Sequence, residues 1–444
     1  MEFEIFIGSV QLEFGNRNLE TCMEYTQWDW DVGKRVIADV NQWRNAFNRV
    51  EEPYVSPDGE TIAAIVEIEE MVFSVCENGV PWENQFDKIW YLRFGPDNLP
   101  SALVSSDAAW TVATAGQPWE NQFDFVWDMQ FGADGKHITI AAQSDGQYFV
   151  VTNDIPWNQK YPTLNNLTIS KDGKNSAAVV QTQPYNSGDI FAFQQGCYSA
   201  AVNGEVWNKN FLNLWEMSFS PDGRHLAAEV RSTLYDYTIV VDGVAWNKNF
   251  SSVWKPKFNP IDGSVSAPVK GPGGWILACD GEMLWDKPFL QLWHHQYSAD
   301  GKNIASIVVP KFGQWTIAVN GVSWPETFDN LVTDLVFSPD GKRVACSART
   351  HGNWTIAADG RRWKNFFDMA WAPVFSPDSR HVAAKVEKNG RFFIAIDGRI
   401  LKQTFSALWE PVFSPDSTKM LIRGIEDEKT GQYCRYVFKL SDLV

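Results

Sequence analysis

The chain has 444 residues, of which 44% are apolar and 21% are charged, and this composition indicates a folded globular protein and excludes a disordered linker. Its formal net charge of −16 disfavours nucleic-acid phosphates and anionic lipid headgroups as partners. The charge favours a basic partner surface, and a contribution to solubility alone is the alternative. No apolar run approaches the roughly 18 residues of a membrane span, and residues 1–7 lack the basic start of a secretory signal. We therefore expect a protein that stays in the compartment where it is made and reaches a membrane only through partner subunits.

Three short apolar segments at the start of the chain predict β-strands, at residues 3–7, 10–14 and 36–40. They precede the repeat described below. We therefore interpret residues 1–50 as closing strands, available to pair with the other end of the chain.

Residues 51–425 consist of one repeating unit, marked by a turn of the type Ser-Pro-Asp-Gly that occurs ten times. The turn aspartates are Asp58, Asp97, Asp134, Asp172, Asp222, Asp262, Asp300, Asp340, Asp378 and Asp416. The steps between them are 39, 37, 38, 50, 40, 38, 40, 38 and 38 residues. A unit that recurs at this period along nearly the whole chain indicates a repeat architecture.

The clearest copy, residues 371–405, shows what each unit contains. Alternating large residues at 371–375 predict a first strand that ends at the turn around Asp378. A second strand is expected at 381–386 and a third at 392–396, where the tight turn Asp397-Gly398 predicts a hairpin. A short fourth segment ends at Phe405. Because four short strands per unit are typical of a propeller blade, the sequence predicts an all-β propeller of about ten four-stranded, WD40-like repeats.

Proline indicates where the first strand of each unit lies. Pro256, Pro373 and Pro411 occupy the same place in three copies. Because proline cannot donate a hydrogen bond to a neighbouring strand, the first strand should be an edge strand that faces the central channel.

The single long step, of 50 residues, reflects an insertion around residues 183–196. Its proline and glycine residues predict an extended surface loop. Loops that break a repeat are where propellers differ from one another, so this loop is a candidate contact site. A tolerated insertion without a function is the alternative.

The C-terminal end contains a strand at residues 420–423 and a last strand at residues 433–440, with no full fourth segment after it. We interpret residues 426–444 as a closing strand that shares one blade with the N-terminus, since this pairing removes open sheet edges. Without a linker or a compositional break, we expect one ring over residues 1–444. Two smaller propellers in series are the alternative.

Twenty of the 22 tryptophans occupy repeat positions, and Trp28 and Trp30 are the exceptions. Nine follow the hairpin turn by three or four residues: Trp43, Trp82, Trp119, Trp157, Trp207, Trp246, Trp285, Trp324 and Trp363. Seven open the first strand: Trp90, Trp127, Trp215, Trp254, Trp293, Trp371 and Trp409. Four precede the hairpin glycine by six residues: Trp110, Trp275, Trp315 and Trp354. Because every copy must pack on its neighbours, we predict that these indoles pack between blades and are not electron relays or sugar platforms.

Departures from the repeat are few. The cysteines, Cys22, Cys76, Cys197, Cys279, Cys346 and Cys434, form no Cys-x-x-Cys motif, which disfavours zinc, iron–sulfur and haem sites. The four at 76, 279, 346 and 434 fall in predicted strands and are expected to be buried thiols.

His137, His225 and His381 follow the turn at a constant distance, whereas His294, His295 and His351 are irregular. Adjacent residues of a regular strand point to opposite faces, so His294 and His295 are not expected to share a metal. Phosphate-binding, dinucleotide-binding, zinc-protease and nucleophile-elbow motifs are absent. The sequence therefore predicts no catalytic, cofactor-binding or metal-binding residues and no enzyme. A pair of carboxylates that meet across the channel, as in propeller glycosidases, remains an alternative.

The motif Phe-Ser-Pro-Asp-Gly at residues 219–223 and 337–341 resembles the WD40-like repeat of TolB-type propellers, a resemblance that covers about nine-tenths of the chain. The chain also resembles the TmcD family, the tryptophan-rich subunits of the Tmc transmembrane redox complexes of sulfate-reducing bacteria. This likeness rests on the acidic N-terminus, on the run Trp-Asn-Lys-Asn-Phe at 207–211 and 246–250, and on repeated Asp-Gly-x-x-Trp units.

The second resemblance implies a cofactor-free subunit on the cytoplasmic side of the inner membrane. Its neighbours would be a membrane cytochrome b and an iron–sulfur subunit, which carry electrons between a periplasmic multihaem cytochrome c and quinone or cytoplasmic acceptors. The predicted function is therefore a non-catalytic interaction subunit of a respiratory electron-transfer complex. A propeller enzyme or lectin acting on glycans or peptides is the alternative, and it predicts a cluster of carboxylates or exposed tryptophans at one rim.

Overall fold

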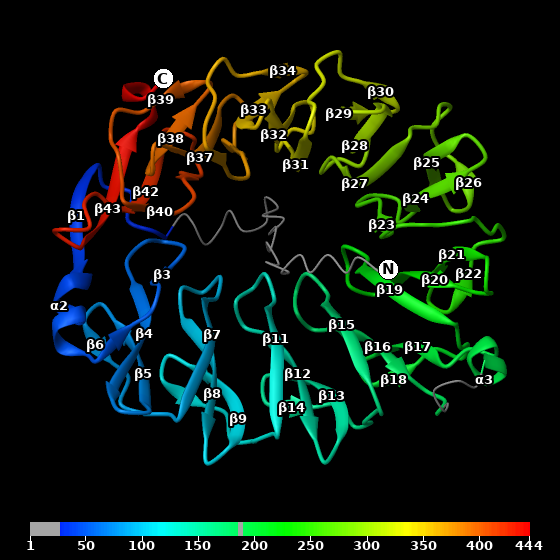
Figure 1. Ribbon diagram of the computed structural model, residues 1–444, viewed down its shortest axis with the longest axis horizontal. Helices are drawn as coiled ribbons and strands as arrows, with labels where there is room; N and C mark the ends of the chain where they lie inside the picture. Colours follow the sequence, from blue (N-terminus) through cyan, green and yellow to red (C-terminus); the bar gives the residue numbers. More distant parts are fainter. Residues whose placement is uncertain (1–26, 185–189) are drawn as a thin grey trace, which may run out of the picture.

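The computed structural model describes residues 27–184 and 190–444. In these ranges the strands form ten antiparallel sheets arranged as blades around a central channel (Figure 1). The all-β fold class is confirmed, and the structure is one ring of ten blades, not two propellers in series. The predicted strands at residues 3–7 and 10–14 lie outside the described residues.

Blades are numbered 1 to 10 in chain order, and each contains four strands from the channel outward. The innermost strands are β2 (Arg49–Val50) with β3 (Tyr54–Val55), β7 (Lys88–Phe94), β11 (Phe125–Phe131), β15 (Leu164–Ile169), β19 (Asn213–Phe219), β23 (Lys257–Phe258), β27 (Gln291–Tyr297), β31 (Leu331–Phe337), β35 (Met369–Ala370) with β36 (Val374–Phe375), and β40 (Ala407–Leu408) with β41 (Val412–Phe413). The second strands are β4 (Ile62–Glu69), β8 (Pro100–Ser106), β12 (Ile138–Ser144), β16 (Ser176–Gln181), β20 (Leu226–Arg231), β24 (Val265–Gly271), β28 (Ile304–Lys311), β32 (Val344–Thr350), β37 (Val382–Lys388) and β42 (Lys419–Ile425).

The third strands are β5 (Val72–Glu77), β9 (Ala109–Thr114), β13 (Gln147–Thr152), β17 (Tyr198–Val202), β21 (Tyr237–Val241), β25 (Gly274–Cys279), β29 (Gln314–Val319), β33 (Asn353–Ala358), β38 (Arg391–Ile396) and β43 (Gln432–Lys439). The outermost strands are β6 (Val80–Pro81), β10 (Gln117–Pro118), β14 (Ile155–Pro156), β18 (Glu205–Val206), β22 (Val244–Ala245), β26 (Glu282–Met283), β30 (Val322–Ser323), β34 (Arg361–Arg362), β39 (Arg399–Ile400) and, in blade 10, β1 (Gly33–Asp39).

The innermost strand is the edge strand that the prolines predict. Pro373 lies between β35 and β36, Pro411 lies between β40 and β41, and β23 begins directly after Pro256. In copies without proline the strand is continuous but bulged, and His294 in β27 adopts a left-handed backbone with a φ of 51°. The proline and the bulge each interrupt the hydrogen bonding of the innermost strand at the same repeat position.

Each Ser-Pro-Asp-Gly turn is held by its own side chains. In blade 5, Ser220 Oγ donates to Asp222 Oδ1 at 2.5 Å, and the Arg224 backbone N–H donates to the same carboxylate oxygen at 3.1 Å. These hydrogen bonds lower the pKa of Asp222 below its usual value. The turn of blade 5 thus satisfies the carboxylate of Asp222 with its own hydroxyl and backbone groups.

Tryptophans pack between neighbouring blades, as predicted. The indole that follows one hairpin lies against the hairpin glycine of the next blade, so that a Cβ added to Gly116 would meet Trp82 Cγ at 3.0 Å. The same arrangement pairs Trp207 with Gly243 and continues around the ring. Of the described tryptophans, only Trp90 and Trp254 are exposed, and both open an innermost strand.

The N-terminus closes the ring through blade 10. Strand β1 pairs antiparallel with β43, so it supplies the outermost strand that the C-terminus lacks. This confirms the predicted closing strand, although β1 spans Gly33–Asp39 and not residues 36–40. Val40 instead begins helix α2 (Val40–Ala46), which Asp39 caps by accepting from Asn41 N at 3.0 Å.

The predicted position of Trp43, after a hairpin turn, is wrong because of helix α2. This residue lies within the helix and does not follow a hairpin. Its indole nevertheless occupies the repeat position, since a Cβ on Gly79 would lie 3.4 Å from Trp43 Nε1. The interblade contact is therefore kept while the local structure differs.

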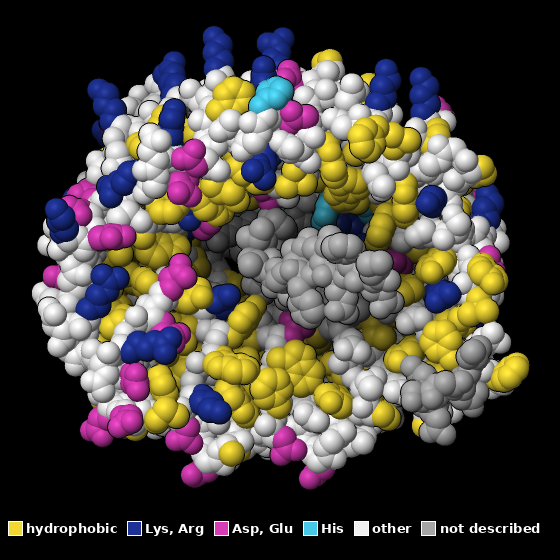
Figure 2. Space-filling model, viewed as in Figure 1, with side chains coloured by type: hydrophobic (Ala, Val, Ile, Leu, Met, Phe, Trp, Pro, Cys, Tyr) yellow, Lys and Arg dark blue, Asp and Glu magenta, His cyan; other side chains and the backbone are white. Residues whose placement is uncertain are grey.

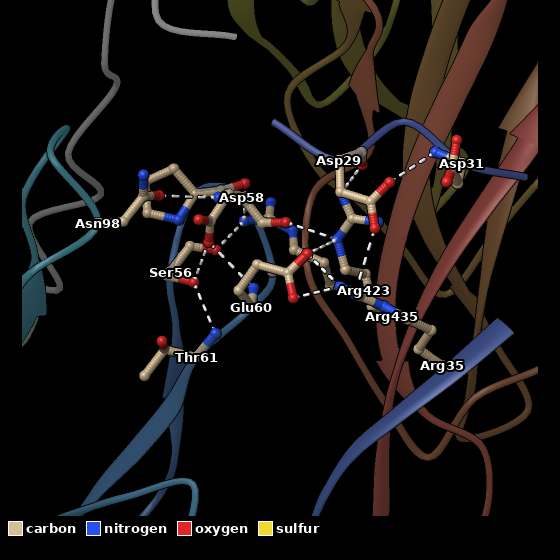
Figure 3. Close-up of polar contacts among 12 residues, drawn as sticks. Asp29, Asp31, Arg35, Ser56, Asp58, Glu60, Thr61, Asn98, Arg423 and Arg435 are labelled. Atoms are coloured by element: carbon tan, nitrogen blue, oxygen red, sulfur yellow. Dashed lines mark hydrogen bonds and ion pairs between the residues drawn. The ribbon is translucent and has the colours of Figure 1, made fainter. Parts of the chain in front are cut away.

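Buried arginines join blade 10 to blade 1 (Figure 3). Arg423 in β42 donates through Nη1 to the carbonyl oxygens of Ser56 at 2.8 Å and Pro57 at 3.1 Å. Its Nη2 donates to the Glu410 carbonyl at 2.8 Å. One guanidinium thus binds the turn of the first blade and the innermost strand of the last blade together.

A second arginine strengthens the same junction. Arg435 Nε donates to the Asp58 carbonyl at 2.8 Å and lies 3.0 Å from Glu60 Oε1. The Tyr433 hydroxyl donates to the Gly59 carbonyl at 3.0 Å. The chain joins blade 10 to blade 1 through the outermost strand β1 and helix α2, and these side chains additionally hold the second and third strands of blade 10 to the turn of blade 1.

Candidate interaction surface and channel wall

Aromatic side chains are exposed at hairpin tips on one face of the ring. Phe191, Tyr235 and Phe312 are 80%, 82% and 96% exposed, and Met71 is exposed as well. We call these four residues the hairpin-tip surface. All lie in connections between a second and a third strand, which end on the same face in every blade. Exposed aromatic residues of this kind are typical anchors of protein interfaces.

The insertion predicted at residues 183–196 contributes Phe191 to this surface. It contains the short helix α3 (Ile190–Gln194) at the periphery of blade 4 (Figure 1), so the prediction of a wholly extended loop is wrong. Its flanks are held to the blade, because Thr182 N donates to the Cys197 carbonyl at 2.8 Å and Thr182 Oγ1 to Asn210 Oδ1 at 2.9 Å.

The opposite face carries exposed apolar residues of a different kind. Val244 and Val322, both 72% exposed, begin outermost strands at the other end of their blades. They recur at one repeat position, as do Val80 and Ile155. Scattered single aliphatic residues are normal on protein surfaces, so this face serves as a natural control for the hairpin-tip surface.

The channel wall of blades 5, 6 and 7 gathers titratable side chains that do not recur in the repeat. Glu216 in blade 5 pairs with Lys255 of blade 6, with Lys255 Nζ 2.9 Å from Glu216 Oε2. Figure 2 shows histidine side chains beside lysine or arginine side chains in the wall of the channel. We call Glu216, Glu229, Lys255, Lys257, His294 and His295 the channel cluster.

The two adjacent histidines have different surroundings. His294 is exposed, whereas His295 is buried at 1% exposure with its Nε2 atom unpartnered. The expectation that they point apart is met, although the strand is bulged here and not regular. Loss of hydration is the main cause that lowers the pKa of each imidazole, because the channel wall surrounds part of His294 and all of His295, and the charge of Lys257 adds to it.

Burial also shifts two further groups of the channel cluster. It raises the pKa of Glu229 to about 8, and the charge of Glu216 acts in the same direction. It lowers the pKa of Lys257 to about 8, with repulsion from Lys255 as the second cause. Glu229 is therefore mostly neutral at neutral pH, and Lys257 is easily deprotonated.

The other histidines belong to the repeat or to its loops. His225 Nδ1 lies 2.6 Å from Asp242 and His381 Nδ1 lies 2.7 Å from Asp397, each at a hairpin turn. His137 lies 3.0 Å from Asp134, and His351 lies 3.0 Å from Asp329. These contacts give each imidazole a structural partner.

The thiols follow the prediction in part. Cys76, Cys346 and Cys434 lie buried in strands, whereas Cys279 lies in β25 but is only partly buried. Cys197 is buried directly before β17. Burial raises the pKa of Cys76 to about 11. Cys22 lies outside the described residues. Within the described ranges, no group of three or more histidine, cysteine, aspartate or glutamate side chains is placed to hold a metal ion.

A pocket of about 480 Å³ opens on the channel side between blades 1 and 2. Its lining includes Glu51, Glu52, Arg49 and Lys88, and the indole of Trp90 is 50% exposed there. Trp90 also packs on Trp110, with ring centroids 5.0 Å apart. The pocket therefore combines one open aromatic face with two acids and two bases.

The repeat pattern pointed to His294 and His295 but missed the rest of the channel cluster. Glu229 stands in a second strand, where alternation predicts an apolar residue, and Lys257 follows the proline of an innermost strand. Charged residues at those places are a signal that can be read from a sequence. That these residues come together from three blades cannot be read from the sequence, because it depends on the curvature of the ring.

These features define the class of the protein as a ten-bladed β-propeller with an aromatic hairpin-tip surface and a partly charged channel. No family model matches the chain, and no curated protein matches it. No helix in the described ranges is long and apolar enough to cross a membrane.

Many solved structures, including the following two, are similar to the chain. One is a crystal structure of a eukaryotic initiation factor, with a TM-score of 0.47 and 13% identity over 77% of this chain and 94% of that one. The other is the β-propeller domain of Cps50 (Swd1) from Myceliophteria thermophila, with a TM-score of 0.31 and 13% identity over 70% of this chain and 96% of that one. Neither likeness is strong enough to bear on function.

Proposed function

We propose that this propeller is a non-catalytic interaction subunit and that the hairpin-tip surface is where a partner docks. One observation supports the proposal above all: Phe191, Tyr235 and Phe312 are 80% or more exposed on one face of a ring, whereas most of the other described aromatic side chains are buried or partly buried. Exposing such side chains to water is unfavourable, at about 25 cal/mol per Å² of apolar surface, and a partner that covers them gains that free energy.

The resemblance to the TmcD family supplies the proposed partners. In this proposal the chain is a cofactor-free subunit of a membrane-bound respiratory complex, on the cytoplasmic side of the inner membrane. It contacts a cytochrome b or an iron–sulfur subunit, in a complex that also includes a multihaem cytochrome c. Because this chain has a net charge of −16, we expect the partner's surface to carry basic residues around an apolar centre.

The test is co-purification of an affinity-tagged chain from mildly solubilised native membranes. We expect redox subunits to co-purify with the wild type and to be lost from the variant Phe191→Ser, Tyr235→Ser, Phe312→Ser. The matched control is Val244→Ser, Val322→Ser on the opposite face, which should retain them. Absence of any membrane or redox subunit from the wild-type preparation would contradict the proposal, as would equal retention by the two variants.

The pocket beside Trp90 favours one alternative function, that of a glycan-binding module. Pyranose rings stack on exposed indoles, and their hydroxyl groups bind both acids and bases such as Glu52 and Lys88. Calorimetry with a glycan panel tests this alternative with Trp90→Ala. The control is Trp254→Ala, which removes an indole at the same repeat position that is 44% exposed but does not line the pocket. Absence of heat with every glycan rejects the alternative.

A further inference from the structure

The channel cluster offers a binding site that is independent of the proposed docking surface. Its six side chains come from three consecutive blades: Glu216 and Glu229 from blade 5, Lys255 and Lys257 from blade 6, and His294 and His295 from blade 7. Their positions are irregular in the repeat, so packing between equivalent blades does not account for them.

The charges in the cluster do not balance. Lys255 has a partner in Glu216, at 2.9 Å. Glu229 is buried, and its pKa near 8 leaves it mostly uncharged at neutral pH. Lys257 then remains as an ammonium group for which the described residues provide no hydrogen-bond acceptor or ion-pair partner on its side chain.

A second polar group beside Lys257 also has no partner. His295 is buried, and its Nε2 atom makes no hydrogen bond. Lys257 lies in β23 and His295 lies in β27, the innermost strands of the neighbouring blades 6 and 7, where Figure 2 shows histidine beside lysine or arginine in the channel wall. Leaving a buried polar atom without a partner costs about 1–3 kcal/mol, so a native protein rarely keeps one without a reason.

We propose that the channel wall at blades 5 to 7 binds a small oxyanion, a carboxylate or a phosphate, between Lys257 and His295. The oxygens of such a ligand accept hydrogen bonds from the ammonium group and from the imidazole once it is protonated. A metal cation is disfavoured by the two lysines.

The titration of the cluster supports this assignment. Burial and neighbouring cations lower the pKa of Lys257 to about 8 and the pKa of His295 well below its usual value. A bound anion opposes both effects and raises both pKa values, so binding is accompanied by proton uptake. At about pH 8, where Lys257 is half protonated, this residue alone takes up as much as half a proton per anion.

The experiment is isothermal titration of the full chain with succinate, with inorganic phosphate and with chloride. We expect saturable binding of at least one oxyanion and none of chloride. The association constant of succinate should fall about tenfold between pH 7 and pH 9, because the protonated fraction of Lys257 falls by that factor. Repeating the titration near pH 8 in buffers of different ionisation enthalpy measures the proton uptake. The preference between succinate and phosphate separates the two ligand sources.

Three variants test the residue assignment. Lys257→Met should abolish binding, and Lys257→Arg should retain it without the loss at high pH. The matched control is Lys385→Met, which removes another partly buried lysine, in β37, whose ammonium group lies 4.3 Å from the Trp371 ring centroid. This control should bind as the wild type does. The wild type failing to bind either oxyanion, or Lys257→Met binding normally, would overturn the assignment. Since Lys257→Met removes a charge without a partner, its melting temperature without ligand should equal or exceed that of the wild type.

Discussion

Replacing Arg423 with methionine should open the ring at its closure. The substitution keeps much of the aliphatic stem but removes the guanidinium that donates to the carbonyls of Ser56, Pro57 and Glu410 at 2.8, 3.1 and 2.8 Å. Arg423 is 3% exposed, so water cannot easily replace these bonds. Hydrogen bonds from a charged donor contribute about 1.5–3 kcal/mol each, but three bonds of one group are not additive. We expect a loss of about 3–5 kcal/mol, the range for removing one partner of a buried charged pair.

A matched control exists at the boundary of blades 8 and 9. Arg343 donates to the carbonyl oxygen of Ser379 at 3.0 Å and pairs with Asp359 at 2.8 Å, but its side chain is 31% exposed. Because water can replace part of this network, Arg343→Met should cost only about 1 kcal/mol.

The assay is urea denaturation followed by circular dichroism, with midpoints compared under identical conditions because a ring of ten blades need not unfold in two states. Limited proteolysis should also cleave Arg423→Met, but not Arg343→Met, near β1, the strand that depends on closure. Equal midpoints for the wild type and Arg423→Met, or a larger loss from Arg343→Met, would refute the claim that buried arginines hold the ring closed.

Three further predictions concern packing and pH. Gly116→Ala should lower the free energy of unfolding by at least about 1 kcal/mol more than Gly146→Ala does. Both glycines have a positive φ, of 80° and 70°, but only Gly116 faces an indole, that of Trp82. Equal losses of melting temperature in the two variants would refute the interblade contact. Trp82→Ala should cost about 3–5 kcal/mol in the free energy of unfolding, and Trp90→Ala much less, as measured in denaturant. For Glu229, the pKa of about 8 in the folded protein lies above the ordinary value of 4.5, so stability is lost as the pH rises from about 4.5 to 8. Glu229→Gln should therefore match the wild type near pH 4 and exceed its melting temperature increasingly up to pH 8, and a constant difference would contradict the burial argument.

Much of the fold could be predicted because the same physical requirement recurs in every blade. Each unit must turn at its Asp, pair a hairpin and bury an aromatic face, so a pattern such as Pro373, Asp378 and Gly398 identifies strand order without coordinates. The closing strand was predictable as well, since the last unit lacks a fourth strand. Its boundary was not, because Asp39 caps a helix that begins in the middle of the expected strand.

The features that set this propeller apart are not contained in the repeat. Arg423 and Arg435 lie in strands where the pattern predicts apolar residues, and only the meeting of the two chain ends explains why they are tolerated. Lys257 and His295 are nearly forty residues apart in sequence, and the ring brings them together. Exposure of Phe312 likewise depends on which end of a blade its hairpin occupies.

The most direct test of the interaction proposal is site-specific photo-cross-linking in native membranes. A photoreactive phenylalanine analogue replaces Phe312 in one sample and Val322 in another, since the two positions lie at opposite ends of strand β29 and are both exposed. We expect a discrete cross-link to a subunit of a membrane redox complex from position 312 and none from position 322. No cross-link from position 312, or the same products from both positions, would contradict it.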